Sequence, residues 1–177
     1  QIIDLATQLA PFSQLKKPIY SVMGNHDEQK PGPALTKDLR RALLANNVKP
    51  IDGTSIDLGV VRLAGIGDIE IPSDLKALTA LALQDKPMLL LTHNPDSKYA
   101  LPKMQQPFVL LAGHTHGGQV NLPVVTQKVL NLVTKQGYKR GLYPLAEGQL
   151  FVTSGIGMIG LPLRFAMPPT IDILQFE

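Results

Sequence analysis

Short apolar runs that stop abruptly at polar loops recur along this 177-residue sequence and constrain its fold more than any other feature. Three are clear, at residues 19–23, 88–91 and 108–112, and a further candidate covers residues 60–64. Such runs, bounded by loops, are typical of strands buried on both faces, as in a parallel sheet. The chain is therefore expected to build its core around several short parallel strands.

Helical patterns lie between the predicted strands, at residues 36–46 and 74–83. The first pattern places Leu39, Leu43 and Leu44 on one face. Alternating strands and helices predict an α/β fold, in which helices cover a sheet. After residue 116 the pattern changes, and strands are predicted with few helices between them. These later strands are expected at residues 119–122, 149–153 and 170–176.

The first residues of the chain have the spacing of an amphipathic helix. Ile2, Leu5, Leu9 and Phe12 recur at helical intervals. Pro11 is expected to end this helix. No N-cap residue is evident before it, which predicts that further chain lies upstream. The absence of a signal peptide or lipid anchor therefore carries no information about the full gene product.

The composition predicts one globular domain and narrows its chemistry. Apolar residues make up 44% of the chain and the net charge is only +3, which suits a well-filled core and gives little reason to expect a nucleic-acid partner. There is no cysteine, so any metal must be held by His, Asp, Glu or Asn. No apolar run approaches the roughly 18 residues that a membrane-spanning helix needs.

All four histidines lie where a predicted strand gives way to a loop: His26, His93, His114 and His116. In α/β sheets, ligands bind in the crevice beyond the carboxyl ends of the strands. A single histidine is more often a hydrogen-bonded core or surface residue than a ligand. Four at equivalent strand ends indicate a shared site.

Two of these histidines form the motif Gly113-His114-Thr115-His116-Gly117-Gly118. Residues two apart in an extended backbone project to the same side, so the two imidazoles are expected to converge on one region. The flanking glycines permit a sharp turn and a close approach to a ligand. The pattern favours a metal site, and the alternative is a solvated loop carrying two surface histidines.

The motif Gly24-Asn25-His26-Asp27 follows the first predicted strand. Asn25 offers a neutral oxygen to a metal, and His26 can carry a proton near neutral pH. Asp27 is expected to orient the His26 ring and keep it protonated. The alternative is a simple turn, for which Gly, Asn and Asp are the usual residues.

His93 supplies a further imidazole after the strand predicted at residues 88–91. Pro95 follows it at an expected helix start. Asp96 is expected to cap that helix rather than to take part in the site.

In these motifs the sequence resembles the calcineurin-like metallophosphoesterase superfamily. Gly24-Asn25-His26-Asp27, the strand-end His93 and Gly113-His114-Thr115-His116 match three of its five motif blocks, in the family's order. The resemblance continues through residues 117–119, 141–143 and 160–165, which are similar to a bacterial phosphodiesterase branch. It therefore covers nearly the whole chain and implies a four-layer α/β/β/α sandwich.

The resemblance implies ligand roles for four residues. Asn25, His93 and His114 resemble the protein ligands of the family's second metal ion, and His116 resembles a ligand of the first. The complete site would hold two divalent or trivalent ions. Oxygen and imidazole ligands without thiolate are compatible with Mn, Fe, Zn or Ni.

The resemblance also implies a reaction. His26 resembles the catalytic histidine that protonates or stabilises the leaving oxygen, and Asp27 resembles its orienting partner. Two ions about 3.5–4 Å apart would hold a hydroxide that displaces the leaving group in line. The implied activity is the hydrolysis of a phosphomonoester or phosphodiester bond in a small substrate.

Two motif blocks that open the family's sequences have no match. No Asp is followed two residues later by His, and the only Gly-Asp, Gly67-Asp68, comes after the Asn-His block. Asp68 is an alternative ligand, but we expect the missing blocks and the first strands to lie upstream. Residues 1–177 would then be about the C-terminal two-thirds of one domain. The protein is expected to be cytoplasmic or peripheral to the inner membrane, and any membrane association is expected only through the missing N-terminus.

Two other functions compete with hydrolysis of a phosphate ester. A catalytically incomplete metal-binding or scaffold module on the same fold would show no turnover. A metallo-β-lactamase-like hydrolase also uses an HxH block, but an Asp-His pair is expected where this chain has Gly117-Gly118. The basic segment 135–140 is expected to be a solvated loop rather than a dock for an anionic substrate or lipid surface. Arg164 either contacts substrate or closes the core.

Overall fold

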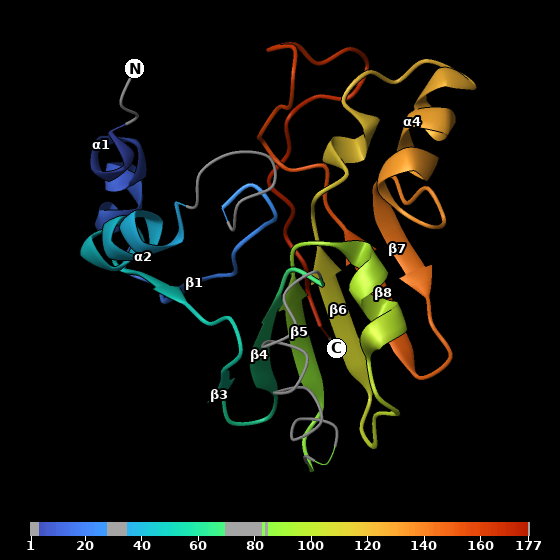
Figure 1. Ribbon diagram of the computed structural model, residues 1–177. Coiled ribbons are helices and arrows are strands. Elements are labelled where there is room, and N and C mark those ends of the chain that lie inside the picture. Colours follow the sequence, from blue (N-terminus) through green and yellow to red (C-terminus); the bar gives the residue numbers. More distant parts are fainter. Residues whose placement is uncertain (1–3, 28–34, 70–82, 84, 177) are drawn as a thin grey trace.

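The computed structural model describes residues 4–27, 35–69, 83 and 85–176, and its strands form two sheets (Figure 1). A two-stranded parallel sheet consists of β1 (Ile19–Ser21) and β2 (Val48–Pro50). The second sheet has six strands. The predicted α/β class is confirmed, and this mixed architecture around a central sheet agrees with the sandwich that the resemblance implies.

The N-terminal helix is shorter than its sequence pattern predicts. α1 covers Leu5–Leu9 and continues as the 3₁₀ helix η1, Ala10–Gln14. The side chain of Asp4 accepts a hydrogen bond from the Thr7 amide at 3.3 Å. This helix therefore has an N-cap, and the expectation of an uncapped start was wrong. Pro11 does not end the helical segment, because it stands in the first turn of η1, where its missing N–H is not needed.

The helix predicted at residues 36–46 is confirmed as α2, Thr36–Ala45. It packs on the two-stranded sheet and on α1. The small core of this region consists of Met23, Leu43 and Val48. Leu44 is 60% exposed, so its predicted place on the buried face was wrong. Successive helical residues are about 100° apart around the axis, which turns Leu44 away from Leu43.

The six-stranded sheet has the order β3-β4-β5-β6-β8-β7 (Figure 1). Its neighbouring inner strands β4, β5, β6 and β8 are parallel, and the edge pairs β3–β4 and β7–β8 are antiparallel. The strands are β3 (Ser55–Asp57), β4 (Arg62–Gly67), β5 (Met88–Thr92), β6 (Phe108–Ala112), β7 (Gly141–Pro144) and β8 (Gly148–Val152). The strands predicted at residues 88–91, 108–112 and 149–153 are confirmed, and the candidate at 60–64 overlaps β4.

The core of this sheet aligns its strands. Leu90 pairs with Leu110, which pairs with Leu150, and all three side chains are fully buried. Burying a leucine stabilises a fold by roughly 1.5–3 kcal/mol. A slip of one residue would turn these side chains to the opposite face. The core therefore fixes the register and, with it, where the strands end.

Two predicted strands are absent and one helix was missed. Residues 119–122 form no strand, because Gln119 has a φ of 53° and Val120 makes only an isolated bridge with Phe165. Residues 170–176 belong to no sheet of the described chain, although apolar residues alternate along them. α4 covers Val125–Val133, where few helices were expected.

The helix predicted at residues 74–83 lies outside the described residues, apart from residue 83. Within the part of the chain that the structure describes, no helix is both long and apolar enough to cross a membrane.

Candidate metal centre

Three neighbouring strands of the large sheet are each followed by a polar side chain. β4 leads to Asp68, β5 to His93 and β6 to His114. Backbone bonds continue the alignment past the strand ends, since the His93 amide donates to Gly67 O at 2.9 Å and the Gly113 amide donates to His93 O at 3.0 Å. The carboxyl ends of parallel strands meet at one edge, which is where α/β proteins bind ligands.

Asn25 joins the two histidines from the turn after β1. Its Oδ1 lies 2.8 Å from Nε2 of His93, and that nitrogen lies 2.9 Å from Nδ1 of His114. The turn is tied to the large sheet through Asp52, whose Oδ1 accepts a hydrogen bond from the Met23 amide at 2.6 Å and whose backbone forms a bridge with β4. Residues from two sheets thus meet in one cluster.

A single hydrogen atom links these three side chains. The amide oxygen of Asn25 only accepts, so Nε2 of His93 carries the hydrogen and Nδ1 of His114 accepts as well. The His114 ring also makes a hydrogen bond with the backbone of Val133. Asn25 Oδ1 and His114 Nδ1 therefore both face Nε2 of His93. If the ring hydrogen of His93 were on Nδ1 instead, all three atoms would present lone pairs to a cation bound between them.

The spacing of these atoms is that of hydrogen bonds, and it is also compatible with ligands that share one first-row metal ion. Two ligands about 2.1 Å from one ion and at right angles to each other lie roughly 3 Å apart. The observed separations of 2.8 and 2.9 Å are close to that value. In the described residues no three His, Asp or Glu side chains form a group that could hold a metal. The cluster therefore depends on the amide of Asn25 as its third donor.

Gly24 allows His93 to reach the cluster. A Cβ atom at this position would lie 2.6 Å from Nδ1 and 2.7 Å from Cε1 of the His93 ring. Real Cβ atoms do not come this close to other heavy atoms. The motif needs glycine here because the imidazole packs directly on its backbone.

Asp68 brings a buried carboxylate to the same edge. It is 2% exposed, and its Oδ2 lies 4.0 Å from Nε2 of His93. The place of Asp68 after the Asn-His block favours carboxylates from upstream over Asp68 as ligands. The sequence does carry a signal for Asp68 as a site residue, because Asp68 directly follows a strand, as the histidines do.

Burial keeps the two central histidines neutral. Burial is the largest cause, and together with the smaller effects of His114, His116 and His26 it lowers the pKa of His93 to about 3. Burial also lowers the pKa of His114, against the charge of Asp68, which raises it. Both rings therefore offer uncharged nitrogen atoms at neutral pH, which is the form that binds metals.

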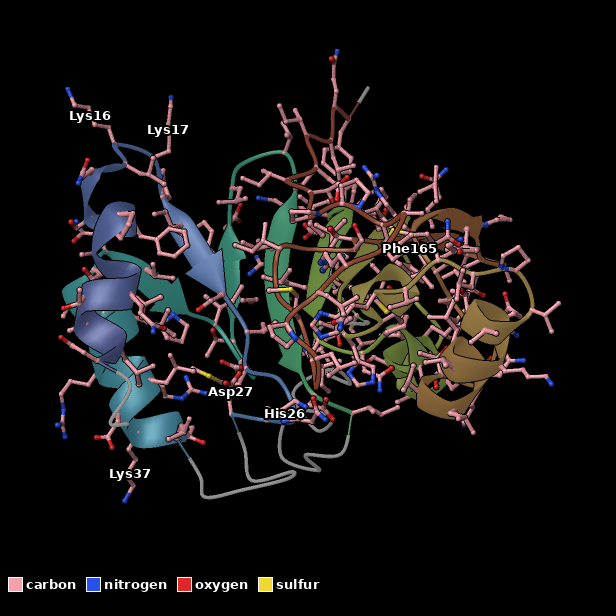
Figure 2. All side chains as sticks on the ribbon, turned by 90° about the horizontal axis from the view of Figure 1, so that it is seen from above. Lys16, Lys17, His26, Asp27, Lys37 and Phe165 are labelled. Carbon is pink, nitrogen blue, oxygen red and sulfur yellow. The ribbon has the colours of Figure 1, made fainter. Side chains whose placement is uncertain are left out.

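His26 and Asp27 lie in the turn after Asn25, between the N-terminal helices and the large sheet (Figure 2). The Asp27 amide donates to Gly24 O at 3.0 Å, and Oδ2 of Asp27 accepts from the Gly24 amide at 2.9 Å. The carboxylate thus stabilises the turn, and its predicted action on the His26 ring stays a prediction. His26 is exposed, and its charge acts on His93.

The HxH motif is not extended. His114 and His116 have φ values of 67° and 50°, so the argument from strand alternation does not hold. Thr115 between them is buried, and its hydroxyl donates to Lys139 O at 3.0 Å. Nδ1 of His114 faces His93, whereas Nδ1 of His116 lies 3.1 Å from Gly157 O. Left-handed backbone at two non-glycine residues is strained and is common at functional sites.

The helix after His93 has a different N-cap residue from the one predicted. Pro95 does begin a helix, η2 (Pro95–Ala100), but its cap is Asn94, whose side chain accepts from the Asp96 amide at 2.9 Å. The expectation that Asp96 is the cap was wrong. Its buried Oδ2 instead accepts from the Lys135 amide at 2.8 Å. The basic segment 135–140 is thereby tied to the strand end that carries His93.

Comparison with known proteins agrees with these motifs. A family model described as "Calcineurin-like phosphoesterase" matches residues 2–118, a span that contains every site residue predicted above. The uncharacterized metallophosphoesterase YkuE of Bacillus subtilis is 32% identical over 99% of this chain and 60% of its own length. No solved structure matches the chain.

Two further relatives cover nearly all of the chain. Phosphodiesterase YaeI of Escherichia coli is 27% identical over 98% of the chain and 66% of its own length. A Bos taurus protein named "Transmembrane protein with metallophosphoesterase domain" is 29% identical over 98% of the chain and 42% of its own length. The chain spans about half the length of the curated relatives that it matches, from 42% to 66% for the three compared.

Proposed function

The chain belongs to the calcineurin-like phosphoesterase family, and from this premise we propose that it hydrolyses a phosphate ester with two metal ions. The observation that carries the proposal is the convergence of Asn25, His93 and His114 on one point.

Asn25, His93 and His114 are proposed to hold one ion, and His116 to contribute to the other. A bound ion would act as a Lewis acid and lower the pKa of a coordinated water. Because the His93 and His114 rings are neutral when metal-free, neither has to lose a proton before it binds the ion. Mn, Fe, Zn and Ni all suit this donor set, and Asp68 adds negative charge beside it.

His26 is proposed to donate the proton that the leaving oxygen needs. It is the exposed member of the four histidines and stands one residue after the ligand Asn25. Asp27 holds the turn through the Gly24 amide and so fixes where Asn25 and His26 project. The proposed substrate is a small phosphomonoester or phosphodiester rather than nucleic acid, and the name of the relative YaeI supports a diester.

Hydrolysis of an aryl phosphodiester and an aryl phosphomonoester, with and without Mn²⁺, tests the proposal. Turnover should require the metal and should fall by about 100-fold or more in His114→Ala. Arg140→Gln is a matched control, because Arg140 pairs with Asp172 at 2.5 Å, away from the cluster. No turnover with Mn, Fe, Zn or Ni would favour the alternative, an incomplete metal-binding or scaffold module. The lack of a three-member His or carboxylate group among the described residues is the observation that keeps this alternative open.

A further inference from the structure

Arg164 is bonded to the loop that faces His116. We propose that Arg164 is a positioning residue that sets the tautomer of His116, so that Nδ1 carries the hydrogen and Nε2 is left to bind a ligand. The metal-binding part of this inference rests on the function proposed above, whereas the tautomer does not depend on it.

The guanidinium of Arg164 is surrounded by backbone oxygen atoms. Nη1 donates to two carbonyls and Nη2 to three, and no carboxylate pairs with this arginine among the described residues. The acceptors are the carbonyl oxygens of His116 (3.2 Å), Met167 (3.3 Å), Ser154 (2.8 Å), Gly155 (3.2 Å) and Gly157 (2.5 Å). Of the two roles left open by the sequence, these contacts favour the closing of the core over contact with substrate.

One of these acceptors also contacts the His116 ring. The oxygen of Gly157 lies 2.5 Å from Nη2 of Arg164 and 3.1 Å from Nδ1 of His116. A carbonyl oxygen has two lone pairs and can only accept, so both nitrogens must donate to it. In the neutral ring the hydrogen then resides on Nδ1, and the lone pair resides on Nε2. Carbonyl groups that bond the second nitrogen of a metal-ligating histidine fix its tautomer and orientation in this way.

Arg164 contacts both the backbone and, indirectly, the ring of His116. It binds the residue's own carbonyl oxygen and, through Gly157, its ring. His116 has a φ of 50°, so this strained backbone needs an external support. The planar guanidinium can donate hydrogen bonds to several carbonyl oxygens at once, whereas the ammonium of lysine is a compact charge with fewer donors. The conservative change to lysine should therefore not restore the arrangement.

Nitrogen-15 NMR of the histidine rings in the metal-free full chain tests the proposal. Wild type and Arg140→Gln should show His116 with its hydrogen on Nδ1. Arg164→Lys and Arg164→Gln should lose that preference and show exchange between the two tautomers. A wild-type protein with the hydrogen on Nε2 would overturn the proposal, even if both variants failed to fold. A folded variant that kept the Nδ1–H form would also overturn it.

A metal titration separates this inference from the proposed function. If His116 is a ligand, His116→Ala should remove one Mn²⁺ site. Arg164→Lys should lower the Mn²⁺ affinity of that same site by about 10–100-fold. The affinity of the site that contains Asn25 should change little. A tautomer change without phosphoesterase activity in wild type would contradict the proposed function and leave the role of Arg164 standing. An unchanged Mn²⁺ affinity together with an unchanged tautomer would contradict the role of Arg164.

Discussion

Nε2 of His93 lies 2.9 Å from Nδ1 of His114, although the two residues are 21 positions apart in the sequence. The parallel register of β5 and β6 produces this contact, because Leu90 lies opposite Leu110 and the two strands end together. The oxygen of Asn25 completes the group at 2.8 Å. The site therefore depends on the sheet core as much as on its own side chains.

Replacing Gly24 by alanine should displace His93. The added Cβ would lie 2.6 Å from Nδ1 of the ring, so the ring or the turn must shift. Overpacking of this kind typically costs about 1–3 kcal/mol of unfolding free energy. Affinity for Mn²⁺ should fall by roughly 10-fold or more, as judged by calorimetric titration.

Gly113→Ala is the matched control for that change. A Cβ there would find its nearest neighbours at 3.9 and 4.0 Å, an ordinary packing distance. Its Mn²⁺ affinity should stay within about 2-fold of wild type, since nothing shifts. If Gly24→Ala behaved like Gly113→Ala, the packing of His93 on Gly24 would be wrong.

The stability of the metal-free chain should fall in acid because of His93. Its pKa is about 3 when folded and about 6.5 when unfolded, so only the unfolded chain takes up a proton between those values. The free energy of unfolding should therefore fall as pH drops from about 6.5 towards 3, by up to about 1.4 kcal/mol per pH unit.

Urea unfolding at pH 7.5, 5.5 and 4.5 measures this slope. His93→Gln should remove most of it, whereas His26→Gln, a change at an exposed ring that is the smallest of the causes acting on His93, should leave most of it in place. A wild-type slope equal to that of His93→Gln would show that His93 takes up its proton normally in the folded chain.

Changing His26 to alanine should lower turnover far more than metal content. The side chain is exposed and is proposed to give a proton to the leaving oxygen, a contribution of typically 10²–10⁴-fold. Elemental analysis of the purified variant should show the metal content of wild type. Equal losses of metal and turnover would remove His26 from the role of acid.

The C-terminal segment should cause the chain to self-associate. Ile171 and Ile173 are 87% and 94% exposed, and Ile171 borders an apolar hollow that Phe12 and Leu111 also line. Exposed apolar surface of this kind promotes association. Light scattering should detect oligomers that Ile171→Lys combined with Ile173→Lys reduces. A wild-type monomer across micromolar concentrations would contradict this prediction.

The sequence predicted best what depends on local pattern. The apolar runs that became β5 and β6 placed His93 and His114 at strand ends, and the core residues Leu90 and Leu110 explain why. Hydrogen bonds between residues far apart in the sequence could not be predicted. One example is the bond to Asp52 that ties the Asn25 turn to the large sheet.

Backbone conformation was also hard to predict from pattern alone. Left-handed φ values at His114 and His116 overrode strand alternation, because tertiary bonds stabilise a conformation that the residue types disfavour. The alternating apolar residues at 170–176 predicted a strand, but a strand needs a partner, and none pairs with them in the described chain. Asp4 was missed as a cap since its role depends on where the first helical turn begins.

Mn²⁺ titration of the chain and of three single variants tests the central claim most directly. If Asn25, His93 and His114 hold one ion, wild type should bind one Mn²⁺ tightly, and Asn25→Ala, His93→Ala and His114→Ala should each remove that same site. A His93→Ala, His114→Ala double variant should then be no weaker than either single variant, because the site is already lost. No tight Mn²⁺ site in wild type, or affinities unchanged in all three variants, would contradict the account.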